Sequence, residues 1–172
     1  MNTLHIIAGL PASGKTTYGR ALAARLNAAF LDIDTATEPV VKAGLALAKQ
    51  NPNDRDSPIF KKAFRIPIYY TLFQVALENL PHINVVLVGP FTAELRNPNW
   101  LDSLIQRIQA PIEIHYVTCN PEQRRLRMQH RNQARDKAKL SDWERHLAYY
   151  RNETPPAFEH RFVDTSNDFT SH

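Results

Sequence analysis

In residues 6–20, with the sequence IIAGLPASGKTTYGR, a short apolar run is followed directly by Gly9, Gly14, a lysine and two threonines. The spacing Gly9-x-x-x-x-Gly14-Lys15-Thr16 is that of a loop whose backbone N–H groups surround phosphate oxygens. It predicts that Lys15 reaches the outer phosphates of a nucleotide and that the Thr16 hydroxyl is a ligand of Mg²⁺. The alternative is a chance glycine-rich turn, but a strand before the loop and a helix after it favour nucleotide binding. The expected nucleotide contacts are Gly9, Pro11, Ala12, Ser13, Gly14, Lys15, Thr16 and Thr17.

Two acids follow the second apolar run of the chain, in the stretch FLDIDTATE. The third apolar run ends in VVLVGPF and offers no carboxylate, so an acid for the Mg²⁺ shell must come from elsewhere. Asp32 and Asp34 are the acids at a strand end near the loop, and a carboxylate there can orient and deprotonate an acceptor hydroxyl. The alternative is structural: Asp34 caps the following helix, and Asp32 is only solvated.

A third candidate group is the arginine-rich segment that begins near residue 121. On a helix, Arg124, Arg127 and Arg131 share one face, which could close over the phosphates as a lid. Arg127 is expected at the nucleotide, while Arg131 or Arg135 supplies positive charge to the transition state. The alternative is a solvated helix face with ion pairs to Glu122 and Asp136. The residues expected to act in catalysis are Lys15, Asp34, Arg131 and Arg135.

These groups must be positioned by alternating strands and helices. Apolar runs bounded by breakers predict strands, and amphipathic stretches between them predict helices. Strands are expected at 4–9, 28–34, 83–88, 112–119 and 160–166. Helices are expected at 14–27, 35–50, 59–80, 99–109 and from 121 onward, with a kink or a second helix start at Pro67. Asn120 is expected to cap the arginine-rich helix, and Ser141 with Glu144 to form a capping box. This alternation predicts a mostly parallel sheet with helices on both faces.

The stretch GLPASGKTTYGRALAARLNAAFLDIDTATEPVV resembles the N-terminal third of shikimate and gluconate kinases, which are P-loop kinases of the nucleoside-monophosphate-kinase type. The resemblance implies a single three-layer α/β domain over residues 1–172, with a five-stranded parallel sheet in the order 2-3-1-4-5. It also implies a lid at about 121–140. In this family the first aspartate of the pair lies near Mg²⁺ and the second contacts the acceptor, which maps onto Asp32 and Asp34.

The sequence departs from shikimate kinases in two places. Gly89-Pro90-Phe91-Thr92 replaces their triple glycine, and Phe64-Arg65 is all that remains of their substrate motif. Residues 85–100 and 119–144 look more like bacterial P-loop kinase-like ATPases, a set that includes relatives of chloramphenicol and zeta-toxin phosphotransferases. The resemblance therefore implies a class of enzyme and leaves the acceptor open.

Two weaker groups were considered as walls of an acceptor pocket. Thr92, Glu94 and Arg96 follow a strand at the sheet edge where open α/β sheets bind ligands. Residues 54–56 lie in a breaker-rich loop, for which a plain surface loop is the favoured interpretation.

Composition limits the function classes further. The chain has a net charge of +4 and one cysteine, Cys119, so an internal disulfide is excluded. The apolar runs are too short to span a membrane, and a cytoplasmic location is expected. The sequence lacks the Asn-Lys-x-Asp motif of GTPases and the Leu-Ser-Gly-Gly signature of ABC ATPases. The favoured function is transfer of phosphate from ATP, with Mg²⁺, to a hydroxyl of a small molecule. A nucleic-acid or tRNA kinase and a nucleotide-binding regulator remain as alternatives.

Overall fold

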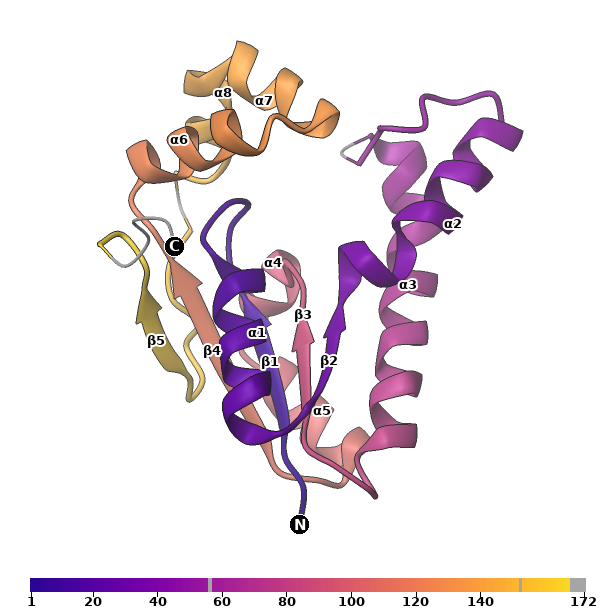
Figure 1. Cartoon of the computed structure of the whole chain (residues 1–172), viewed down its shortest axis with the longest axis vertical. Coiled ribbons are helices and arrows are strands. Elements are labelled where there is room, and N and C mark those ends of the chain that lie inside the picture. The colour runs from indigo at the N-terminus through magenta and orange to yellow at the C-terminus, as the bar shows by residue number, and fades with distance from the viewer. Residues whose placement is uncertain (56, 152, 168–172) are drawn as a thin grey trace.

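Five parallel strands form one sheet in the order β2-β3-β1-β4-β5, which confirms the predicted topology (Figure 1). This computed structural model describes residues 1–55, 57–151 and 153–167, except for the side chain of Arg135. The strands are β1 (Leu4–Ala8), β2 (Ala29–Asp32), β3 (Val85–Val88), β4 (Ile112–Thr118) and β5 (Arg161–Asp164). The three central strands carry apolar runs because helices cover both of their faces.

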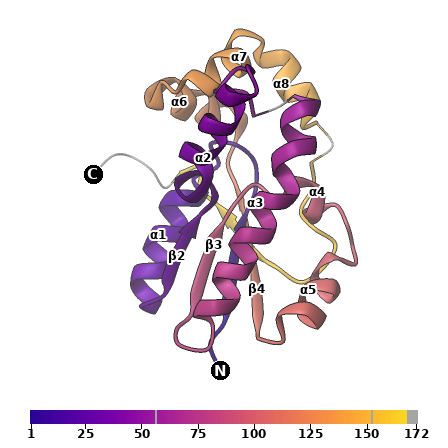
Figure 2. The ribbon, with the colours of Figure 1, turned by 90° about the vertical axis from the view of Figure 1, so that its right-hand side faces the viewer.

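Alternating side chains of β1 enter two separate hydrophobic clusters. Leu4 and Ile6 pack on one face of the sheet, whereas Ile7 packs on the other. The first cluster is covered by α3 (Pro58–Asn79), α4 (Thr92–Leu95) and α5 (Trp100–Ile108), and the second by α1 (Lys15–Leu26). Figure 2 shows α1 on one side of the sheet and α4 and α5 on the other, so the domain has the three layers that were expected.

Helices α2 (Ile33–Leu47) and α3 form a pair beside the β2 edge of the sheet (Figure 1). α3 begins with the Ser57 hydroxyl capping the Phe60 N–H and continues through Pro67 to Asn79. The expectation that a second helix could start at Pro67 is therefore wrong. α2 starts two residues earlier than expected, at Ile33, because the Asp32 carboxylate caps it.

The arginine-rich segment folds into α6 (Pro121–Arg131), a 3-10 turn η1 (Ala134–Asp136), α7 (Lys137–Ser141) and α8 (Trp143–Tyr149). Asn120 caps α6 through its side chain, as predicted. The capping box at Ser141 and Glu144 is wrong: Ser141 ends α7, and the Asp142 carboxylate caps α8 by accepting from the Arg145 N–H. Asp142 occupies the N-cap position directly before α8, from which its carboxylate reaches a free N–H group of the first turn, whereas Ser141 is still part of α7. No helix in the described part of the chain has the length and apolar character needed to cross a bilayer.

Candidate functional site

The loop between β1 and α1 has the curled backbone that the motif predicts. Gly9 has φ 143° and Gly14 has φ 88°, values that only glycine adopts readily. A Cβ atom at Gly9 would lie 2.1 Å from the Val117 carbonyl oxygen, so β4 excludes any side chain there. Ala12 also has a positive φ of 60°. The loop can therefore bring its backbone N–H groups close to an anion placed above it.

The loop and the start of α1 leave polar groups that fit phosphate oxygens. Gly14 occupies the N-cap position of α1 and no side chain caps the helix there, so its first N–H groups point at the loop. Among the described residues the buried Ser13 hydroxyl has no hydrogen-bond partner. The Lys15 ammonium donates to the Leu10 carbonyl at 2.6 Å, across the loop. These donors can bind the oxygens of a triphosphate with the loop backbone as it stands.

Lys15 is electrostatically unusual. Burial, together with the charges of Arg131 and Arg124, lowers the pKa of its ammonium to about 7, although Asp34 and Asp32 act in the opposite direction. A site that destabilises its own cation in this way gains from an anionic ligand, because the ligand restores the charge.

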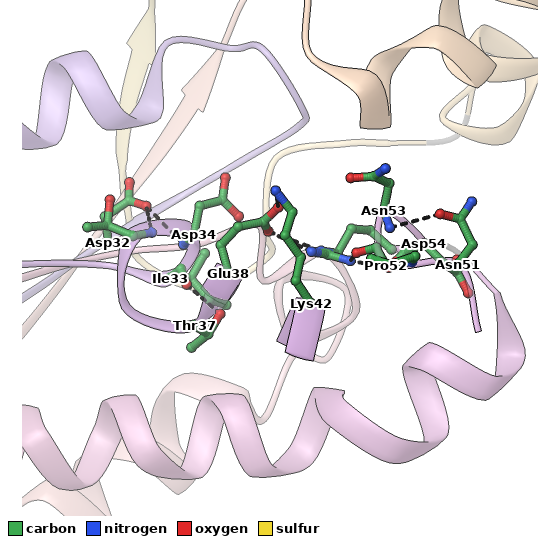
Figure 3. A network of polar contacts seen from close by, with 12 residues as sticks. Asp32, Ile33, Asp34, Thr37, Glu38, Lys42, Asn51, Pro52, Asn53 and Asp54 are labelled. Atoms are coloured by element: carbon green, nitrogen blue, oxygen red, sulfur yellow. Dashed lines mark hydrogen bonds and ion pairs between the residues drawn. The ribbon is translucent and has the colours of Figure 1, made fainter. Parts of the chain in front are cut away.

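Asp32 joins the phosphate loop to α2. Its Oδ2 accepts a hydrogen bond from the Thr16 hydroxyl at 2.8 Å, and its Oδ1 accepts from the backbone N–H groups of Asp34 and Thr35 (Figure 3). The two residues predicted to hold Mg²⁺, Thr16 and Asp32, are thus in contact. The helix cap that was considered for Asp34 is instead supplied by Asp32. Asp34 lies exposed in the first turn of α2, one turn before Glu38.

Arg127 and Thr165 fasten the loop from the side of α6. Arg127 donates to the Thr165 hydroxyl at 2.9 Å and to the Thr165 carbonyl at 2.6 Å. The buried Thr165 hydroxyl in turn donates to the Ser13 carbonyl at 2.7 Å. Arg127 thus lies beside the loop, and its role at the nucleotide stays a prediction. Thr165 was missed, although its position directly after β5 at the carboxyl edge of the sheet was a usable signal.

Arg124 lies beneath the loop instead of facing the cavity. It is 3% exposed, its Nε donates to the Pro11 carbonyl at 3.0 Å, and its Nη2 contacts His146 Nε2 at 3.1 Å. Arg131 forms a bidentate ion pair with the buried Asp136: Nε donates to Oδ2 at 2.5 Å and Nη2 donates to Oδ1 at 2.8 Å. The ion pair between Arg131 and Asp136 that was kept as the alternative therefore exists, although Arg131 also lines the cavity. The side chain of Arg135 lies outside the described residues.

A cavity of about 730 Å³ brings most of the predicted residues together. It lies between the phosphate loop, the α2–α3 pair and the segment α6 to α8 (Figure 1). The predicted residues on its wall are Pro11, Ala12, Gly14, Lys15, Thr16, Thr17, Asp32, Asp34, Arg127 and Arg131. Gly9 and Ser13 sit in the loop behind this wall.

The end of the cavity away from the loop is lined by residues of α2, α3 and α4. Arg65 of α3 pairs with Glu94 of α4 at 2.7 Å, and Arg55 pairs with Glu38 of α2 at 2.8 Å. Thr92 and Arg96 also line it, in agreement with the pocket interpretation of that segment. Arg55 lies on the wall too, so the plain surface-loop interpretation of residues 54–56 is wrong for Arg55. Asp56 lies outside the described residues.

Several wall residues were missed at this end, among them Phe60, Lys61, Ile68, Tyr149 and Tyr150. Tyr69 packs against the hydrophobic core and also lines the cavity, where burial together with the Glu94 charge raises the pKa of its hydroxyl to about 12. The helical spacing of these residues suits packing as well as it suits a pocket, so the sequence alone gave no signal for them.

Comparison with known proteins shows the family of the chain and the fold that it shares with solved structures. A family model described as AAA_33, an AAA domain, matches residues 4–153. No curated protein matches the sequence. A provisionally named kinase from Chloroflexus aurantiacus J-10-fl is similar in structure, with 20% identity, coverage of 96% of this chain and 89% of that chain, and a TM-score of 0.68.

Two further solved structures share the fold. A sugar kinase from Janibacter sp. HTCC2649 has 16% identity and a TM-score of 0.58, with 96% of this chain and 85% of that chain covered. A gluconokinase from Sinorhizobium meliloti 1021 has 18% identity and a TM-score of 0.54, with 98% and 84% covered. The chain therefore belongs to the AAA_33 family of AAA domains and has the fold of the P-loop kinases.

Proposed function

We propose that this protein transfers the γ-phosphate of ATP, in the presence of Mg²⁺, to a hydroxyl group of a small molecule. The observation that carries the proposal is that one cavity holds both the Lys15 ammonium and the Asp34 carboxylate. A phosphate donor bound at the loop and an acceptor bound beside α2 would meet between these two groups. Positioning of the two reactants is the main source of catalysis in phosphoryl transfer.

The donor side is supported by the fit of the loop to a triphosphate. The free N–H groups at the start of α1, the buried Ser13 hydroxyl and the Lys15 ammonium are donors for phosphate oxygens. The Thr16 hydroxyl and the Asp32 carboxylate would hold Mg²⁺, which neutralises phosphate charge when bound. Asp32 keeps its other oxygen on the cap of α2, so the position of this acid is set by the helix.

The transfer step assigns one task to each side chain. The acceptor oxygen forms a bond to the γ-phosphorus while the bond from that phosphorus to the bridging oxygen breaks. The electron pair of the broken bond leaves with ADP, and the acceptor proton moves to the Asp34 carboxylate. Lys15 and Arg131 stabilise the negative charge that accumulates on the transferring group, because both line the cavity.

The walls of the cavity favour a small acceptor. A volume of about 730 Å³ is in the range of small-molecule sites, even with a triphosphate occupying part of it. Glu38, Arg55 and Arg65 line the cavity with charged groups, and these groups are held by the ion pairs Arg55–Glu38 and Arg65–Glu94, which suits hydrogen bonds to several hydroxyl groups. The apolar surfaces of Ile68 and Tyr69 lie beside them.

A phosphorylation screen with ATP and Mg²⁺ tests this proposal, with hydroxyl-bearing metabolites in one set and RNA and DNA 5′-hydroxyl ends in another. Once an acceptor is found, Asp34→Asn is expected to lower kcat by about 10² or more while nucleotide affinity is kept. Asp102→Asn is the matched control, because Asp102 lies in the first turn of α5, away from the cavity, and should keep full activity.

Unchanged turnover in Asp34→Asn would remove Asp34 from the mechanism. Phosphorylation confined to the nucleic-acid set, with steep loss of binding at raised salt, would establish the nucleic-acid alternative instead. Nucleotide binding without transfer to any acceptor would favour a regulator.

A further inference from the structure

Two histidines and a glutamate lie together beneath α1, outside the cavity. His5 is on β1, and Glu113 and His115 are on β4. The register pairs His5 with Glu113 and Ile7 with His115, so all of these side chains project from the same face of the sheet, the face that α1 covers. His5 is 7% exposed and His115 is 1% exposed. The proposed phosphate transfer uses none of these residues.

The three potential ligand atoms form a compact triangle. His5 Nδ1 lies 2.9 Å from Glu113 Oε2 and 3.2 Å from His115 Nε2, and the remaining side, from His115 Nε2 to Glu113 Oε2, is 3.6 Å. Ligands bound tetrahedrally at about 2.0–2.1 Å from a zinc ion are separated from one another by roughly 3.3 Å. The triangle therefore already has the size of three corners of a tetrahedral zinc site. Its β1 ligand, His5, lies at least 108 positions in sequence from the two ligands on β4.

The far sides of His115 and Glu113 are held as a metal site requires. His115 Nδ1 contacts the Tyr18 hydroxyl of α1 at 2.8 Å, which lets Nδ1 carry the proton and turns the Nε2 lone pair toward the other two atoms. The Oε1 atom of Glu113 accepts from Arg161 of β5, which leaves Oε2 directed at the histidines.

We propose that His5, Glu113 and His115 form a binding site for a Zn²⁺ ion, with water as the fourth ligand. Two imidazole nitrogens and one carboxylate oxygen are a ligand set that suits zinc, whereas Mg²⁺ prefers oxygen ligands. Glu113 has a side chain that is 27% exposed, which gives the ion and its water a way in from solvent. The ion would join β1 to β4 and, through Tyr18, both strands to α1, the helix that begins at the phosphate loop.

A titration with zinc chloride tests the site on the full-length protein after treatment with a chelator. Excess Mg²⁺ is kept present so that Thr16 and Asp32 do not contribute. One zinc ion per chain is expected, with Tm raised by roughly 5–10 °C at a hundredfold excess over Kd. Tyr18→Phe should weaken zinc binding by about 10- to 100-fold, and Glu113→Gln should weaken it more.

His130→Gln is the matched control, because His130 is exposed on α6 and lies outside the cluster, and its zinc affinity should equal that of the wild type. Circular dichroism checks that each variant is folded, and the wild-type titration decides the question even if a variant is not. Absence of zinc binding by the wild type would overturn the proposal and leave a hydrogen-bonded histidine pair. Equal zinc affinity in folded Glu113→Gln and His130→Gln would also overturn it, because the ion would then be bound elsewhere.

Discussion

Lys15 carries an ammonium group in a place that disfavours its charge. Burial and the neighbouring Arg131 and Arg124 lower its pKa to about 7, although Asp34 and Asp32 act against this shift. In the nucleotide-free protein at pH 8, most molecules therefore have a neutral Lys15. A bound triphosphate raises the pKa again, so nucleotide binding above pH 7 takes up a proton.

We therefore expect nucleotide affinity to fall as the pH rises from 7.5 to 9, with a slope that approaches tenfold per pH unit. Lys15→Ala should bind nucleotide roughly 10- to 100-fold more weakly at pH 7.5, since a charge-assisted hydrogen bond is lost. Its remaining affinity should no longer vary with pH over this range. Isothermal titration calorimetry with an ATP analogue at several pH values measures both effects.

A wild-type affinity that stays constant from pH 7.5 to 9 would show that Lys15 keeps its charge without nucleotide. Unchanged affinity in Lys15→Ala would go further and contradict the assignment of this loop to phosphate binding. The glycine-lysine spacing was enough to predict the loop from the sequence. The lowered pKa was not predictable, because it depends first on burial in the folded chain and then on arginines that lie more than 100 residues away in sequence.

At the scale of elements, the junction between β2 and α2 fixes both acids. The strand ends at Asp32, and the same residue caps the helix, so Asp34 falls in the first turn beside the cavity. The sequence predicted that the two acids follow a strand, but it offered Asp34, and not Asp32, as the possible cap of the helix. That choice depends on the residue at which pairing with β3 stops, which is Val88 opposite Asp32. A local pattern does not contain this information.

Two substitutions of Asp32 separate its structural and metal-binding roles. Asp32→Asn keeps an oxygen that accepts from the N–H groups of α2, so stability should change little, because asparagine caps helices as well as aspartate does. It removes the negative charge, so Mg²⁺-dependent nucleotide binding should need about tenfold more Mg²⁺. Asp32→Ala loses the cap as well and should lower the free energy of unfolding by about 0.5–2 kcal/mol.

Urea denaturation and Mg²⁺ titrations of nucleotide affinity measure these two effects separately. If Asp32→Asn needs no more Mg²⁺ than the wild type does, Asp32 is only a helix cap, and the predicted metal role is wrong.

The contacts that anchor the phosphate loop show where prediction from sequence stops. The pattern of residues 121–131 was sufficient to predict α6, the helix to which Arg124, Arg127 and Arg131 belong. Their partners were not predictable: Arg124 contacts Pro11, 113 positions away, and Thr165 contacts Ser13, 152 positions away. Such contacts arise only after β1, β4 and β5 have assembled side by side, which is a property of the whole sheet.

At the scale of the whole molecule, the cavity lies between two arms that extend beyond the carboxyl edge of the sheet. One arm is the α2–α3 pair, and the other runs from α6 to α8 (Figure 1). We expected residues 121–140 to act together as a lid. Arg124 and Arg127 instead tie the first two turns of α6 to the phosphate loop, so this part should stay in place when nucleotide binds. We therefore expect motion on nucleotide binding only in the chain beyond Arg131.

Hydrogen exchange with and without a non-hydrolysable ATP analogue tests this division of the lid. Protection should increase over residues 132–151, where Lys139, Tyr149 and Tyr150 face the cavity, and should stay nearly constant over residues 121–131. The physical reason is that a triphosphate attracts the cationic segment and closes the cavity over itself. An equal change over both ranges, or no change in either, would contradict the division.

Arg131 sits at the boundary between the fixed and moving parts, and its pair with Asp136 fixes the start of the moving segment. Arg131→Ala should lower kcat by about 10² and change ATP affinity much less, because charge on the transferring group is greatest in the transition state.

The Arg131→Ala substitution also leaves the buried Asp136 without its arginine partner, so Asp136→Asn is the matched control. This variant weakens the same pair but keeps the arginine charge at the cavity. If Arg131 acts on the phosphate, steady-state kinetics should show a large loss of kcat only in Arg131→Ala, while hydrogen exchange over 132–151 becomes faster in both variants. Equal loss of kcat in the two variants would mean that the pair between Arg131 and Asp136 matters only for closing the lid. The positive charge in the transition state would then come from another residue, and Arg135 is the candidate that the sequence offers.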